Sequence, residues 1–274
     1  MLRSAKFLAA AAFCAICSLF VSQGETLPQP GGTVARKGDG TTNAVKPVPE
    51  IVAANEGLYS KLKSFICAEH IERFASKKRG DPERHLDTLS AQVSFENGQE
   101  HYSAVKRNGQ KLAGLSSVAG AWSEGEFGTL LRQTEDLLRT AAVQFDGGGE
   151  ISGIAVSRVH FDVPERDSPW DLEVAGRHYR VPFRTEVWVG KASGEIFRII
   201  RRSTGEIGDT KIAALEWSVT LGPVDLSGGT WLLPKDGEYV VTYANSGRRE
   251  WNELSFSNYH RYGAEVALRF DGQE

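Results

Sequence analysis

The sequence predicts an α+β protein that is predominantly antiparallel β, with a strongly curved sheet, or half-barrel, and two or so helices against its concave face. Apolar residues alternate with a period of two over most of the chain after Leu86. The connections between these runs are short, which favours antiparallel pairing because parallel strands need long crossovers. Only two segments have the 3.6-residue period of an amphipathic helix.

Residues 1–24 have the pattern of a signal peptide. Arg3 and Lys6 precede an apolar stretch from Phe7 to Val21, and the small residues of Ser22-Gln23-Gly24 favour cleavage after Gly24. The stretch is shorter than the roughly 20 residues that span a bilayer, so cleavage is preferred over retention as an anchor. We therefore expect a periplasmic or secreted protein.

Residues 25–50 are rich in proline and glycine and are expected to form a flexible linker, since they contain few large apolar side chains. Residues 51–274 then form a single β-rich half-barrel domain. Its first helix uses Val52, Leu58, Leu62 and Phe65 on one side, and a strand follows at about Ile66 to Phe74.

A β-hairpin and a second helix come next. Alternation through Ala91, Val93 and Phe95 leads to an Asn97-Gly98 turn, and a strand follows over residues 101–106. Ser123, with Glu126 three residues later, has the spacing of a capping box. The apolar face of the helix that this box would begin is formed by Phe127, Leu130, Leu131, Leu137 and Leu138.

The rest of the chain is expected to be strands. Gly147-Gly148-Gly149 is interpreted as a loose turn, because it lacks the Lys-Ser/Thr pair and the helix of a phosphate-binding loop. The strands that we expect after it cover 154–163, 185–189, 195–202, 215–221, 231–233, 239–243, 249–257 and 264–270.

Composition excludes some classes of partner and site. The formal net charge of −3 argues against nucleic acid. Cys14 and Cys17 lie in the leader, so Cys67 is the one cysteine of the mature chain, and its apolar neighbours predict a buried thiol. No two of the six histidines have the spacing of zinc ligands on a helix, and neither a metal nor another cofactor is expected.

Two polar features have competing interpretations. Ser123 in Ala-Trp-Ser-Glu-Gly resembles the nucleophile of a hydrolase, but the parallel sheet of a nucleophile elbow is missing, and helix capping is preferred. Arg198, Arg201 and Arg202, with Lys211, could contact anionic lipid headgroups at a membrane surface; a solvated strand face is preferred.

One strand pair carries a resemblance to a known family. Val187-Trp188-Val189 leads through Ser193-Gly194 into Ile196-Phe197-Arg198-Ile199. With the leader, linker and helix before it, this order resembles the LolA/LolB-like lipoprotein-carrier superfamily, which includes MucB/RseB-type regulator domains. The chain also resembles exported bacterial proteins of unknown activity. The superfamily resemblance implies a hydrophobic half-barrel, closed by helices, that accommodates acyl chains.

We therefore expect an exported, non-enzymatic binding protein for a lipid or for lipoprotein acyl chains. The candidates for lining its apolar cavity are Trp188, Trp217, Phe127 and Leu131. The alternative is an envelope interaction or scaffold domain that engages a protein partner and has no ligand cavity. A hydrolase that uses Ser123 is the third and least favoured reading.

Overall fold

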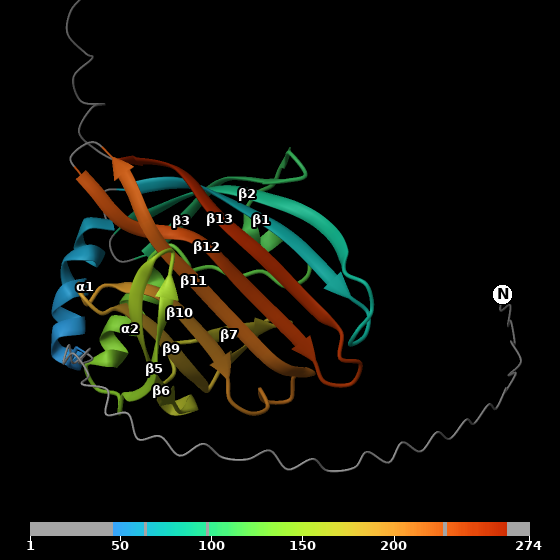
Figure 1. The fold of residues 1–274 in the computed structure, drawn as a ribbon. Coiled ribbons are helices and arrows are strands. Elements are labelled where there is room, and N and C mark those ends of the chain that lie inside the picture. The colour runs from blue at the N-terminus through green and yellow to red at the C-terminus, as the bar shows by residue number, and fades with distance from the viewer. Residues whose placement is uncertain (1–45, 63–64, 97–98, 227–228, 262–274) are drawn as a thin grey trace, which may run out of the picture. The chain divides into compact units, whose positions relative to one another are not determined.

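Eleven strands form one antiparallel sheet in the computed structural model, which describes residues 46–62, 65–96, 99–226 and 229–261 (Figure 1). All of these residues belong to one compact unit, residues 43–274. The strands in sheet order are β4 (Gln110–Lys111), β3 (Gln99–Arg107), β2 (Arg84–Glu96), β1 (Phe65–Ser76), β13 (Arg249–Arg261), β12 (Gly229–Tyr243), β11 (Ile212–Leu226), β10 (Ile196–Ser203), β9 (Phe183–Gly190), β6 (Ile154–Val163) and β5 (Gln144–Ile151).

The remaining elements are few. They are the helices α1 (Val48–Leu62) and α2 (Thr129–Leu138), the 3-10 turns η1 (Leu115–Ser117) and η2 (Glu165–Asp167), and a separate hairpin of β7 (Asp171–Val174) and β8 (Arg177–Arg180). Figure 1 shows α1 and α2 beside each other, and Arg139 joins them through an ion pair of 2.7 Å with Glu56. The predicted signal peptide, nearly all of the predicted linker and the strand expected at 264–270 lie outside the described residues.

The predicted fold class is confirmed. Each pairing in the sheet is antiparallel, and the sheet is an open, curved half-barrel, with β4 and β5 at its two ends. In β1 the inward side chains alternate along the strand, and Phe65, Cys67 and Ile71 are buried in the main core. The thiol of Cys67 is free and buried, as predicted.

The residues just before α2 pack against the inner face of the sheet. Phe127 stacks on Tyr259 of β13 with ring centroids 6.1 Å apart. Gly128 lies so close to Phe95 of β2 that a Cβ atom there would be 2.9 Å from the ring. Glycine at this position allows the chain to approach the sheet before the helix begins.

The capping-box prediction is wrong. Helix α2 begins at Thr129 with Gly128 as its N-cap, so Ser123 and Glu126 both precede the helix. The backbone N–H groups of Gly128 and Thr129 instead donate to Glu100 Oε1 of β3, each at 2.8 Å. A carboxylate from a neighbouring strand therefore supplies the negative charge that a helix N-terminus favours.

Three other local predictions also need correction. The segments 231–233 and 239–243, expected as separate strands, belong to the single strand β12. The Gly147-Gly148-Gly149 run lies inside the edge strand β5, where a Cβ on Gly149 would be 3.1 Å from the ring of Trp188. The run therefore serves close packing in a strand and does not form a turn. Phe65 belongs to β1, not to the first helix, which ends at Leu62.

Candidate functional site

A cleft of about 970 Å³ lies between the inner face of the sheet and the segments that cover it. Its floor is formed by Trp217 of β11 and by Tyr239, Val241 and Tyr243 of β12. The β7–β8 hairpin forms one wall, and the segment that precedes α2 forms another. An aromatic floor with polar groups near its edges is typical of a site for a partly apolar small molecule.

The hairpin wall is attached to the sheet through Trp170. The indole ring of Trp170 lies 5.8 Å from that of Trp217 and 5.7 Å from the ring of Phe183, measured between centroids. At the far side of the hairpin, the Tyr179 hydroxyl donates to Asp209 Oδ1 at 2.6 Å. These contacts hold the hairpin at the edge of the cleft at two separate points.

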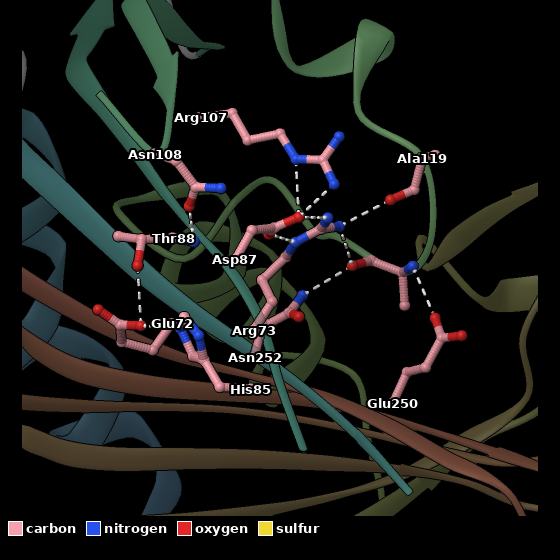
Figure 2. Close-up of polar contacts among 11 residues, drawn as sticks. Glu72, Arg73, His85, Asp87, Thr88, Arg107, Asn108, Ala119, Glu250 and Asn252 are labelled. Atoms are coloured by element: carbon pink, nitrogen blue, oxygen red, sulfur yellow. Dashed lines mark hydrogen bonds and ion pairs between the residues drawn. The ribbon is translucent and has the colours of Figure 1, made fainter. Parts of the chain in front are cut away.

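The opposite wall is the segment 116–124, which has little regular structure, and a polar network fastens it to the sheet (Figure 2). Arg73 Nη1 donates to the carbonyl oxygens of Ala119, at 2.9 Å, and Ala121, at 3.3 Å. Asn252 Nδ2 donates to the same Ala121 oxygen at 3.1 Å, and the Ala121 N–H donates to Glu250 Oε2 at 3.0 Å.

A buried ion pair holds Arg73 in place for these contacts. Arg73 Nε and Nη2 donate to the two carboxylate oxygens of Asp87 at 2.6 and 2.8 Å, and both side chains are at most 3% exposed. Arg107 Nε donates to Asp87 Oδ2 at 2.7 Å from the solvent side. The hydrogen bonds from Arg73 hold the pKa of the Asp87 carboxyl below its usual value of 3.8.

Two buried carboxyl groups lie near the floor. Glu126 Oε1 accepts hydrogen bonds from Trp217 Nε1, at 2.6 Å, and from the hydroxyl of Ser123. Burial raises the pKa of Glu126 to about 7. Burial, reinforced by Glu126, also raises the pKa of Glu69 well above 4.5, and the carboxyl oxygens of Glu69 have no hydrogen-bond partner among the described residues. Burial therefore makes both carboxyl groups weaker acids than a glutamate in water.

The four residues predicted to line a cavity occupy different places. Trp217 lines the cleft, whereas Phe127 and Leu131 lie in the main core. Trp188 of β9 is half-buried away from the cleft, and its Nε1 donates to Glu186 Oε1 at 2.5 Å. Whether any of the four contacts a ligand stays a prediction.

Sequence reasoning missed the hairpin that forms one wall. Its turn contains Ala175 and Gly176, both with positive φ, between two short alternating runs. That pattern would have predicted β7 and β8. It would also have placed Trp170 directly before the hairpin. It would not have shown that the hairpin folds back over Trp217.

The preferred interpretation of the arginine run is wrong at one position. Arg202 is exposed and its Nε donates to Glu216 Oε2 at 2.7 Å, as expected for a solvated face. Arg201, in contrast, is 0% exposed. Alternation along β10 directs Arg201 inward, beside Trp217 of the cleft floor and against α2.

The residues described give no support to hydrolysis by Ser123. Its hydroxyl donates to Glu126 Oε1, and no histidine within the described ranges forms a hydrogen bond with it. The same part of the chain contains no group of three or more His, Cys, Asp or Glu residues that could hold a metal ion. It also contains no helix with the length and apolar composition to cross a membrane.

Comparisons with known proteins give similarity only at the level of solved structures. No protein-family model and no curated protein sequence matches the chain. A DUF1329 family protein from Desulfovibrio piger is 11% identical, with a TM-score of 0.40, over 82% of this chain and 95% of the other. A putative outer membrane lipoprotein-sorting protein domain from Vibrio parahaemolyticus is 13% identical, with a TM-score of 0.34, over 82% and 96%. The lipoprotein LppX of Mycobacterium tuberculosis is 12% identical, with a TM-score of 0.27, over 77% and 95%.

Proposed function

We propose that this chain is an exported, non-enzymatic binding protein that holds a lipid or the acyl chain of a lipoprotein in the cleft above Trp217. The observation that carries the proposal is the cleft itself, whose volume of about 970 Å³ is large enough for a lipid-sized molecule. Export rests on the signal-peptide pattern of residues 1–24.

The walls of the cleft support binding without catalysis. Trp217, Tyr239 and Val241 line the floor but are at most 5% exposed. The half-buried side chains of Trp122, Leu172 and Tyr243 offer more aromatic and aliphatic surface to an apolar chain. The segment 116–124 is held by the side chains of Arg73 and Asn252, so this wall is ordered before a ligand arrives. A preformed site avoids part of the entropic cost of binding.

The alternative of a scaffold domain with a filled interior agrees less well with this geometry. It requires that the helices and loops leave no hollow over the sheet, yet the described residues leave the cleft open. A protein partner that brings its own acyl chain remains within the proposal, because the acyl chain would occupy the same cleft.

The test is binding of N-phenyl-1-naphthylamine, an uncharged probe that fluoresces in apolar sites, to the protein produced with its own leader. Ala121→Trp fills the cleft from its wall, while Ala155→Trp makes the same change at an exposed position of β6 outside the cleft. We expect saturable binding that Ala121→Trp weakens at least about tenfold, since a clash of only ~1.4 kcal/mol does so. Equal affinity in both variants would overturn the proposal.

Native mass spectrometry of protein purified gently from its own envelope identifies the ligand. We expect a copurified lipid or acylated species in the wild type and its loss in the Ala121→Trp variant. Protein that carries no adduct and also fails to bind the probe would show that the cleft is not a ligand site.

A further inference from the structure

One row of buried side chains runs across eight strands of the sheet and contains both the cleft floor and two arginines. Its members follow from the strand register, each paired with the next: Phe161, Thr185, Arg201, Trp217, Tyr239, Asn252, Arg73 and Asp87. All of them are at most 5% exposed. The row therefore places a buried positive charge on each side of the aromatic floor.

The two arginines are compensated differently. Arg73 forms a two-bond ion pair with Asp87. Arg201 forms no ion pair with any carboxylate in the part of the chain that the structure describes; its Nη1 donates to Gln133 Oε1 at 2.7 Å and its Nη2 to Thr134 Oγ1 at 3.3 Å. Its Nε is buried without a hydrogen-bond partner among those residues. An uncompensated buried charge is costly, which makes Arg201 a candidate for pairing with something else.

Arg201 remains a cation in this environment. Its guanidinium carbon lies 4.7 Å from the ring centroid of Phe183 and 5.7 Å from that of Trp217, so both rings stabilise its charge. Burial lowers the pKa of Arg201 to about 9, which leaves it protonated at neutral pH. Neither the rings nor the two neutral hydrogen-bond acceptors cancel the charge.

Only one layer of side chains separates Arg201 from the cleft. Gln133 and Trp217 line the cleft on one side and contact Arg201 on the other. Gln133 is half-buried on α2, and rotation of its side chain would free Arg201 Nη1 for another acceptor. Its carbonyl oxygen occupies the place that an anionic oxygen of a ligand would take.

We propose that the cleft selects an anionic amphiphile, whose acid group replaces the Gln133 amide oxygen on Arg201 while its apolar chain lies against Trp217 and Tyr239. This inference rests on the proposed function and adds the chemical class of the ligand. A carboxylate or a phosphate group provides the same chemistry, because each brings a negative oxygen to the guanidinium.

Acidic side chains also line the cleft, and Glu173 is one of them on the hairpin wall. At the hairpin, Asp171 is paired with His178 at 2.6 Å and Asp209 with Arg177 at 2.6 Å. Glu124 lies on the opposite wall, and partial burial raises the pKa of its carboxyl above 4.5. Behind Gln133 and Trp217, Arg201 supplies a buried positive charge that has no carboxylate partner among the described residues.

The test compares ligands with the same twelve-carbon chain by displacement of N-phenyl-1-naphthylamine: dodecanoate, dodecyl phosphate and the uncharged dodecanol. We expect the better of the two acids to bind at least about tenfold more tightly than dodecanol, a difference of ~1.4 kcal/mol, because charge-assisted hydrogen bonds are stronger than neutral ones. The two acids distinguish a carboxylate from a phosphate source.

Arg201→Met removes the charge, and Arg202→Met makes the same change on the opposite, exposed face of β10. We expect Arg201→Met to lose the preference for acids and keep its affinity for dodecanol, and Arg202→Met to keep both. Gln133→Glu, which supplies a carboxylate from the protein, is expected to abolish the preference too. This second variant tests the idea even where Arg201→Met does not fold.

Two results would overturn the inference. One is equal affinity of the wild type for the acids and the alcohol, which leaves the proposed function intact because an uncharged ligand still binds. The other is an acid preference that persists in both Arg201→Met and Gln133→Glu. Failure of all three ligands and of the probe to bind would instead remove the proposed function and this inference together.

Discussion

Replacement of Asp87 by alanine tests how the wall of the cleft is held. Asp87 accepts two hydrogen bonds from Arg73 and one from Arg107, and Arg73 in turn reaches the carbonyl oxygens of Ala119 and Ala121 (Figure 2). Asp87→Ala leaves the Arg73 guanidinium, whose side chain is 3% exposed, without its counterion. The perturbation therefore affects both stability and the cleft wall.

The expected magnitude follows from this burial. Removing one partner of a buried ion pair costs about 3–5 kcal/mol, because the remaining charge stays desolvated. For a domain of this size, each kcal/mol lowers the Tm by roughly 2–4 °C, so we expect a decrease of roughly 6–20 °C. Asp162→Ala is the matched control: Asp162 and Arg184 form a similar pair at 2.8 Å in which both side chains are 54% exposed, and we expect less than about 1 kcal/mol.

The assay is urea unfolding at neutral pH, followed by binding of N-phenyl-1-naphthylamine to the folded variants. Asp87→Ala should also weaken probe binding, since Arg73 no longer holds the segment 116–124. Combining Asp87→Ala with Arg73→Met should recover part of the lost stability, because the double variant leaves no unpaired buried charge at this site. A cost for Asp87→Ala no greater than that for Asp162→Ala would refute the reasoning.

The stability that Asp87 contributes should also depend on pH, and the direction of the change can be predicted. The pKa of Asp87 is lower in the folded protein than its ordinary value of 3.8, so the stability it contributes is present above that value. This contribution is lost as the pH falls below 3.8 through the lowered folded-state pKa. The difference between the wild type and Asp87→Ala should therefore shrink in acid, and a difference that grows would contradict the assignment.

Three other predictions follow from buried groups. Because burial raises the pKa of Glu126 from 4.5 to about 7, the folded state binds this proton more tightly than the unfolded state, and the free energy of unfolding should fall as the pH rises through that range. Glu126→Gln should make this fall shallower in urea titrations at several pH values; equal slopes would speak against a buried, titrating Glu126. Gly125→Ala should destabilise the protein by about 1–3 kcal/mol in the same assay, because φ at this position is +114° and the added Cβ would lie 3.1 Å from Trp217. An unchanged urea midpoint of unfolding would count against this close packing. Burial raises the pKa of Cys67, so iodoacetamide should modify it only in denaturant, and rapid labelling of the folded protein would contradict its position in the core.

Much of the architecture could be predicted because it depends on local patterns. Alternation from Ala91 to Phe95 and through Val187 and Val189 identified strands, and the Ser193-Gly194 turn connected β9 to β10 as expected. Short connections then implied antiparallel pairing. Residues 97 and 98 lie outside the described residues, but β2 ends at Glu96 and β3 begins at Gln99, as a hairpin requires.

The candidate site was far less predictable. Trp217 was one of four expected cavity residues, but its alternating strand pattern could not show that Trp170 would cover it. Arg201 has the parity of Ile199 and thus of an inward position, yet a buried arginine runs against the usual exposure of this residue type. The cap of α2 by Glu100 has no local signal, since the two lie on different elements.

By itself, then, the sequence determined a leader-like segment at residues 1–24, a β-rich chain, and the parity of most strands, because each depends on neighbouring residues. Only the tertiary structure decided which strands are adjacent: β1 pairs with β13, near the other end of the chain. That pairing brings Asn252 beside Arg73, and the sheet order places Arg201 next to Trp217. Local periodicity does not encode sheet order, so the cleft and its charges could emerge only once the whole sheet had formed.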